Sequence, residues 1–136
     1  YTAKISGPLL DRIDIHVEVP ALGYNELSRT EPAEPSAEIR SRVIAARAFA
    51  AARTEGALTC NGLMTPADIR RFCRMDDAGG RLMQTAYDKF ALSARAYDRI
   101  LKVARTAADF DKSEIIRKEH IGLALQLRSM SKKYWQ

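Results

Sequence analysis

The spacing of apolar residues along the chain changes near residue 20. Over residues 13–19, isoleucine and valine alternate with aspartate, histidine and glutamate, and this period of two predicts one half-buried β-strand. A Gly7-Pro8 turn and a short helical turn at residues 9–11 precede it. A strand needs hydrogen-bonding partners at its edges, and none is obvious in this sequence. We therefore expect the strand to pair with another segment or another copy of the chain, or to fray.

From residue 36 onward, apolar residues recur at helical spacing. The stretch before it, residues 20–36, holds three prolines and a glycine and ends in Pro35-Ser36, which is typical of a linker followed by a helix start. The predicted helices run from Ser36 to near Gly56, from Thr65 over a short stretch, from about Asp76 to Phe90, from Ser93 to about Phe110, and from about Lys118 to Met130. The expected fold class is mainly α: a small helical bundle preceded by a short helix and one strand.

Capping residues support two of these helix starts most clearly. Thr65 precedes Pro66 and Asp68, which places a hydroxyl cap, a first-turn proline and an acid at the positive end of the helix dipole. Ser93 stands in the same way before an alanine-rich amphipathic run. The Gly79-Gly80 pair weakens the expected third helix near its beginning.

Composition agrees with a helical domain. The 21 alanines favour close-packed helices over a sheet core, and the apolar fraction of 46% excludes a disordered chain. No apolar run is long enough to predict a membrane span. The cysteines, Cys60 and Cys73, have no partners at zinc-ligand spacing, and a reducing cytoplasm is the expected location. Because the first residue is Tyr1 rather than methionine, we expect a piece excised from a longer polypeptide.

The sequence offers arginines rather than a catalytic motif. It has no glycine-rich phosphate loop, no nucleophile motif and no metal-ligand cluster, and a structural role is the favoured interpretation for His16 and for His120. Arg12 follows Leu-Leu-Asp at the junction of a turn and a strand, and Arg95 lies in the first turn of a helix, where the dipole disfavours a cation. Two interpretations stay open for each: Arg12 pairs with a neighbouring aspartate or meets an anion, and Arg95 points to solvent or meets an anion.

Two long motifs carry a resemblance to a known family. The first is Lys-Ile-Ser-Gly-Pro-Leu-Leu-Asp-Arg-Ile-Asp-Ile-His-Val-Glu-Val-Pro at residues 4–20, and the second is Leu-Ser-Ala-Arg-Ala-Tyr-Asp-Arg-Ile-Leu-Lys-Val-Ala-Arg-Thr at residues 92–106. Both resemble the magnesium-chelatase-like AAA+ ATPases of the YifB/ComM type. Cys60-Asn61 and residues 115–127 resemble that family as well. The resemblance divides the chain into the end of an ATPase core (1–20), a linker (21–35) and a helical lid (36–136).

The resemblance implies a ring of identical subunits, expected to be hexameric, with ATP and Mg²⁺ bound between neighbours. Arg12 would then be an arginine finger acting in trans, and Asp11 would orient it or join the subunit contact. Arg95 matches the sensor 2 residue, which contacts phosphate in cis, and Arg99 could extend this basic face. The Walker A loop and Walker B acid of the family are absent from this sequence, so we expect the chain alone to bind ATP weakly and to be inactive as an ATPase.

The sequence leaves more than one substrate possible. The YifB/ComM branch implies DNA processing, as an ATP-driven branch-migration motor. A protein or metalloporphyrin substrate is the alternative, as in a true magnesium chelatase subunit that inserts Mg²⁺ into porphyrin. A second alternative is a stand-alone basic helical module that binds nucleic acid, based on the net charge of +5 and the Lys-Lys-Tyr-Trp segment at residues 132–135. No membrane partner is expected.

Overall fold

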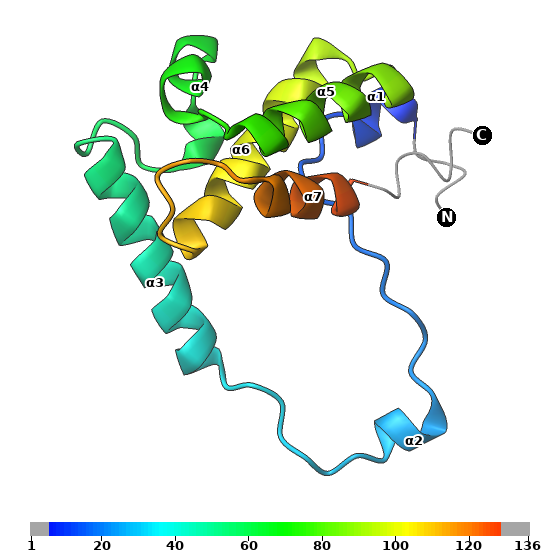
Figure 1. Cartoon of the computed structure of the whole chain (residues 1–136). Coiled ribbons are helices and arrows are strands. Elements are labelled where there is room, and N and C mark those ends of the chain that lie inside the picture. Colours follow the sequence, from blue (N-terminus) through cyan, green and yellow to red (C-terminus); the bar gives the residue numbers. More distant parts are fainter. Residues whose placement is uncertain (1–5, 129–136) are drawn as a thin grey trace.

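The structure is a computed structural model that describes residues 6–128, and helices dominate it (Figure 1). The mainly α fold class expected from the sequence is confirmed. The α-helices are α1 (Gly7–Leu10), α2 (Tyr24–Leu27), α3 (Ser36–Arg53), α4 (Pro66–Phe72), α5 (Asp77–Phe90), α6 (Ala94–Phe110) and α7 (Lys118–Gln126), and a short 3-10 helix, η2, spans Asn61–Leu63. The end of the last predicted helix at Met130 and the basic segment 132–135 lie outside the described residues.

Local capping interactions fix the helix boundaries at the predicted places. The Thr65 hydroxyl accepts a hydrogen bond from the Asp68 N–H at 3.3 Å, and the Asp68 carboxylate accepts one from the Thr65 N–H at 2.8 Å. The Ser93 hydroxyl accepts the Ala96 N–H at 3.1 Å. At the other end of a helix, Gly56 adopts a φ of 74° and donates its N–H to the carbonyl of Ala51 at 2.9 Å, so the turn closes α3 where the sequence predicted.

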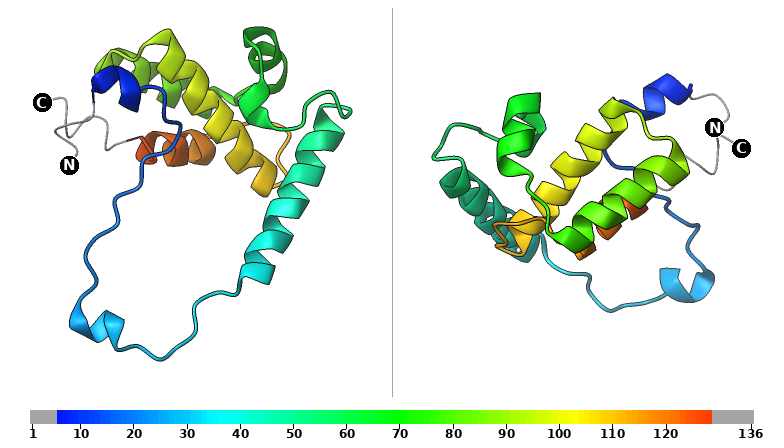
Figure 2. Two further views of the ribbon diagram at one scale, coloured as in Figure 1. Left: turned by 180° about the vertical axis from the view of Figure 1, so that it is seen from behind. Right: turned by 45° about the horizontal axis from the view of Figure 1, so that its top comes forward.

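The core forms around α6, which packs against α3, α4 and α7, while α5 packs against α7 (Figure 2). Its fully buried apolar side chains include Met83, Ile100, Ile116 and Ile121. Burying one such side chain stabilises a fold by roughly 1.5–3 kcal/mol, so this cluster is the main source of the bundle's stability. Tyr97, in the first turn of α6, packs against this cluster.

A short parallel bridge ties the chain before α5 to the chain before α7. Met75 pairs with Ile116, and the Asp76 N–H donates to the Ile116 carbonyl at 3.0 Å. Gly79 lies against this bridge: a Cβ there would be 2.9 Å from an Asp76 carboxylate oxygen and 3.4 Å from the Ile116 carbonyl oxygen. The close approach explains why a glycine, otherwise unfavourable in a helix, stands in the first turn of α5.

The strand predicted over residues 13–19 is not formed. These residues are extended, but they join no sheet within residues 6–128, and one backbone hydrogen bond, from the His16 N–H to the Leu127 carbonyl at 2.7 Å, ties them to the bundle. The alternating pattern is present, but no second strand is available to complete a ladder. Val17 and Val19 are therefore exposed, and the chain continues through α2 as a long excursion from the bundle (Figure 1).

Candidate functional site

The Arg12 side chain extends from a tight turn that follows α1. The Arg12 N–H donates to the Leu9 carbonyl at 3.0 Å, and the Ile13 N–H donates to the Leu10 carbonyl at 3.1 Å. The backbone position of Arg12 is therefore fixed by the turn. Its guanidinium is exposed and forms no ion pair with any residue of the described segment 6–128.

The two carboxylates beside Arg12 are both engaged elsewhere. Asp11 lies 3.7 Å from the guanidinium of Arg128, and Asp14 forms an ion pair with Arg99. The local salt bridge that the sequence left open for Arg12 is therefore not formed. Asp11 also does not contact Arg12 through its carboxylate, and the structure instead places it against the end of α7.

Arg128 is buried and holds the turn that carries Arg12 against the end of the bundle. Its side chain is 6% exposed, and its Nη1 donates to the Ile13 carbonyl at 2.7 Å. Burial lowers the pKa of Arg128, and the nearby Asp11 carboxylate opposes that shift. The sequence contained a sign of this burial, because Arg128 follows Ile121 and Ala124 at helical spacing and so falls on the apolar face of the helix.

Arg95 occupies the second position of α6, two residues after the Ser93 cap. The first turn of α6 contains no acidic residue, and Arg95 is exposed and has no ion-pair partner in residues 6–128. A cation at the positive end of a helix dipole is disfavoured by about 0.3–1 kcal/mol. The arrangement leaves a positively charged helix start with nothing in the described structure to neutralise it.

Arg99 brings the two motifs together. It lies one turn beyond Arg95 and forms the ion pair with Asp14, which is two residues beyond Arg12. The pair is partly exposed, so its energy is modest, but it fixes the extended segment against α6. Lys102, the next basic residue on this face, donates to the Gly62 carbonyl at 3.0 Å. Arg99 and Lys102 therefore make structural contacts here.

Comparison with known proteins matches both parts of the chain to one family. The family described as "Magnesium chelatase, subunit ChlI C-terminal" matches residues 33–128, and "Magnesium chelatase, subunit ChlI" matches residues 1–27. The chain belongs to the magnesium chelatase ChlI C-terminal family. Competence protein ComM of Haemophilus influenzae is 37% identical over 131 residues, which are 96% of this chain and 25% of that protein. Uncharacterized protein YifB of Escherichia coli is 36% identical over 133 residues, which are 97% of this chain and 26% of that protein.

The resemblance to proteins of the YifB/ComM type is thereby confirmed, and the chain spans about a quarter of the length of these curated relatives. Arg12 and Asp11 lie in the ChlI match, whereas Arg95 and Arg99 lie in the ChlI C-terminal match. The two exposed arginines thus come from segments that match separate parts of the family.

A buried ionic network supports the ChlI C-terminal bundle behind α6. The Asp109 carboxylate accepts hydrogen bonds from Arg53 Nη2 at 3.0 Å, from Arg105 Nε at 3.2 Å and from Asn61 Nδ2 at 2.7 Å. Arg105 is fully buried, and burial lowers its pKa while Asp109 opposes the shift. The sequence analysis did not anticipate this network. The i, i+4 spacing of Arg105 and Asp109 on the alanine-rich face of α6 was the available signal.

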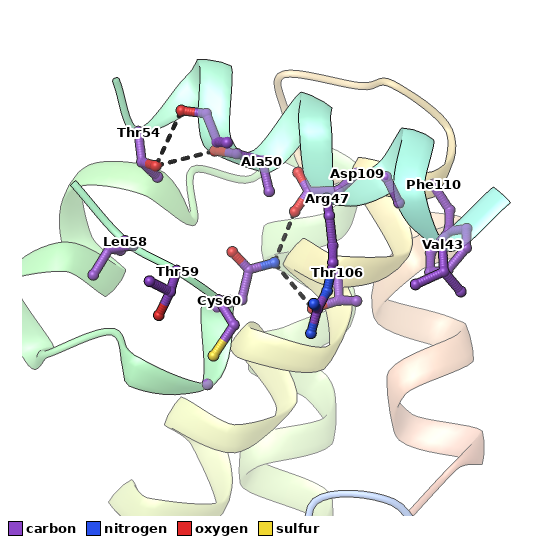
Figure 3. A pocket seen from close by; sticks show the side chains of 14 residues that line it. Val43, Arg47, Ala50, Thr54, Leu58, Thr59, Cys60, Thr106, Asp109 and Phe110 are labelled. Carbon is purple, nitrogen blue, oxygen red and sulfur yellow. Dashed lines mark hydrogen bonds between the residues drawn. The ribbon is translucent and has the colours of Figure 1, made fainter. Parts of the chain in front are cut away.

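A cavity of about 210 Å³ lies beside this network, between α3, α6 and the loop before η2 (Figure 3). Val43, Ala50, Leu58 and Phe110 give it mostly apolar walls, and Asp109 closes one side. Neither Arg12 nor Arg95 lines it. This cavity is therefore separate from the two exposed arginines.

The histidines have structural contacts. His120 Nδ1 accepts the Arg117 N–H at 2.9 Å, and Nε2 lies 2.8 Å from the Asp111 carboxylate, so the ring closes the start of α7. His16 Nε2 lies 3.1 Å from the Leu10 carbonyl oxygen. In residues 6–128, no group of three or more His, Cys, Asp and Glu residues is placed to hold a metal ion. None of the helices described for this ChlI C-terminal chain has the length and apolar content that a membrane span requires.

Proposed function

We propose that the chain is the C-terminal part of a cytoplasmic ring-forming AAA+ ATPase in which Arg12 acts as a trans arginine finger and Arg95 as the sensor 2 residue. ATP and Mg²⁺ would be held chiefly by residues outside this chain. In this arrangement Arg12 reaches the terminal phosphate of the nucleotide on the neighbouring subunit, and Arg95 contacts phosphate within its own subunit. The ring is expected to be a hexamer.

The observation that carries the proposal is the contrast among neighbouring arginines. Arg99 and Arg128 are committed to Asp14 and to the turn after α1, whereas Arg12 and Arg95 are exposed and lack an ion-pair partner in residues 6–128. A guanidinium that is positioned by fixed backbone and left unpaired suits a phosphate oxygen, because planar N–H donors match phosphate geometry. Stabilisation of charge on the transferred phosphoryl group would follow.

The contacts also support coupling between the two arginines. The Asp14–Arg99 ion pair and the Arg128 hydrogen bond to the Ile13 carbonyl link the turn that carries Arg12 to α6 and α7. A shift of the bundle on nucleotide binding would thus be transmitted to Arg12. We infer that this linkage couples the nucleotide state of one subunit to the nucleotide site of the neighbouring subunit.

We propose DNA as the remodelled substrate, with branch migration as the work performed. The support is the relative named Competence protein ComM, since competence concerns DNA uptake. A protein or metalloporphyrin substrate remains the alternative. Branched DNA offered to the full-length parent tests the choice: ATP-dependent movement of the junction is expected, and stimulation by porphyrin with no effect on junctions would contradict it.

Subunit mixing in the full-length parent tests the two arginine roles separately. The proposal requires a glycine-rich loop ending in Gly-Lys-Ser/Thr upstream of Tyr1, and its lysine supplies a phosphate-loop variant. Arg12→Ala alone should reduce ATP turnover by roughly a thousandfold or more. Mixed with phosphate-loop variant subunits, Arg12→Ala subunits should regain turnover, because the neighbour supplies a finger to an intact site.

Arg95→Ala should behave differently in the same mixture. A cis residue leaves no complete site in any pairing with the phosphate-loop variant, so turnover should stay low. Loss of one charged interaction with phosphate should also weaken nucleotide binding roughly ten- to hundredfold. Arg81→Ala, an exposed arginine on α5, is the matched control and should leave turnover unchanged. Normal turnover in both Arg12→Ala and Arg95→Ala would refute the assignment.

A further inference from the structure

A second basic feature lies elsewhere on the bundle, at the junction of α3, α4 and the loop before α7. It is an open pocket of about 670 Å³, called here the arginine pocket, and its lining includes Arg53, Arg70, Arg71, Arg74 and the rings of Phe49 and Phe72. Figure 1 shows α4 near the C-terminal end of α3, which is the arrangement that gathers these side chains. Neither Arg12 nor Arg95 belongs to it.

The rim of the arginine pocket carries unpaired positive charge. Arg70, Arg71 and Arg74 are exposed, and none forms an ion pair with another residue of the described chain. One carboxylate, that of Glu114, lies among the lining residues. Four arginines against one glutamate give the lining a net positive charge, although Asp68 lies close enough to interact with Arg71, and this charge favours an anion.

The floor of the pocket adds to this potential. Arg53 is 10% exposed, and it shares the single carboxylate of Asp109 with Arg105, which is fully buried. Two guanidinium groups and one carboxylate leave a buried positive charge without full compensation. The Arg53 Nη1 atom is also buried without a hydrogen-bond partner in residues 6–128. A buried charge in this state is costly, and an anion close by lowers that cost.

The aromatic lining indicates what else the anion carries. Phe72 is flanked by two cations, with the Arg53 and Arg71 guanidinium carbons 5.5 Å and 4.9 Å from its ring centroid. Phe49 is half-buried and faces the same pocket. Guanidinium forks bind phosphate oxygens, while guanidinium planes and aromatic rings both stack on planar bases. The volume exceeds that of a phosphate and lies within the range of pockets that hold small organic ligands.

We propose that the arginine pocket binds a phosphate group joined to a planar base, that is, one nucleotide unit, supplied by a single-stranded nucleic acid or by a free mononucleotide. The phosphate lies among Arg70, Arg74 and Arg71, and the base packs in the part lined by Phe49. This proposal depends only on the residues that line the arginine pocket, and it is independent of the ATPase roles proposed for Arg12 and Arg95. Binding here needs no hydrolysis, so the two proposals can fail separately.

Binding by the 136-residue chain at low salt, without ATP, tests the site. Fluorescence anisotropy measures the binding of a short labelled oligothymidylate. Competition by thymidine monophosphate and by inorganic phosphate then shows whether a strand, a free mononucleotide or phosphate alone occupies the site. Competition by the mononucleotide as strong as by the unlabelled strand identifies a free nucleotide as sufficient. Competition by the strand alone identifies the strand. If inorganic phosphate competes as well as either, the base makes no contribution and the proposal is wrong.

Variants locate the binding. Arg70→Gln combined with Arg74→Gln should weaken binding about tenfold or more and should lower the salt dependence by about 0.7 for each phosphate that the variant no longer neutralises. Glu114→Gln, which removes the one acidic lining residue, should strengthen binding about two- to threefold. The matched control is Arg40→Gln combined with Arg81→Gln, two exposed arginines outside the pocket, and it should keep affinity within about twofold.

The opposite signs expected for the arginine and glutamate variants keep the test independent of folding. Thermal unfolding of each variant checks that the bundle is intact, since all five positions are exposed. The proposal is overturned if the chain binds neither nucleotide source, or if the control pair loses as much affinity as the pocket pair. The second result would assign binding to net charge alone.

Discussion

Asp109 is a position where an isosteric substitution should cost the bundle several kcal/mol. Asp109→Asn keeps the size of a side chain that is 2% exposed, but it removes the negative charge that Arg53 and Arg105 share. The carboxylate accepts four hydrogen bonds, three of them from guanidinium groups. Breaking a buried ion pair from one side costs about 3–5 kcal/mol, because the remaining charge stays buried. Here two charges stay buried, so we expect the upper part of that range.

Urea unfolding followed by helical circular dichroism measures the effect. A small domain has about 5–15 kcal/mol of stability in total, so Asp109→Asn should move the midpoint far toward zero urea. Arg53→Leu should cost less, because Arg105 and Asp109 then remain as a balanced pair. The double variant should be more stable than the sum of the single losses predicts. Asp88→Asn, at an exposed position on α5, is the control. A loss below about 1 kcal/mol for Asp109→Asn would refute the charge argument.

Three further outcomes follow from individual side chains. Burial raises the pKa of the Cys73 thiol to about 11, so the unfolded chain loses this proton at lower pH than the folded chain. The free energy of unfolding should therefore fall by about 2 kcal/mol between pH 9 and 11, and Cys73→Ala should lack this part of the decline. His120→Ala removes the ring that closes α7 and should lower stability by about 1–2 kcal/mol in thermal unfolding, whereas an unchanged midpoint would contradict this role of the ring. Asp14→Asn breaks the ion pair with Arg99; global stability should change by at most about 1 kcal/mol, but hydrogen exchange at the His16 amide should accelerate.

The helices could be predicted because their signals are local. Thr65 and Ser93 bond to N–H groups three residues away, and Gly56 closes α3 within one turn, so a short window of sequence contains the whole interaction. Arg12 and Arg95 could be singled out for the same reason: each stands beside a turn or cap that is visible in the sequence. The family resemblance then gave those positions a role to test.

The long-range ionic interactions could not be predicted in this way. Arg53 and Asp109 are 56 residues apart in sequence, and Arg128 is 115 residues from Ile13. Periodicity assigns Arg53 to a polar face, and only the packing of α3 on α6 shows that this face is covered at its C-terminal end. The strand expectation for residues 13–19 failed for the converse reason, since a correct local pattern needs a partner that local sequence does not supply.

The contacts next to Arg12 have a consequence for assembly. Asp14 is held by Arg99, and the carbonyl of Ile13 is held by Arg128, so the start of the extended segment is fixed to the bundle at two points. Beyond them, Val17 and Val19 remain exposed with unpaired strand-like geometry. A partner that completes a sheet with this segment would come to lie next to Arg12. Completion of a sheet would therefore occur at the surface that carries Arg12, so the position of the proposed trans finger would depend on assembly.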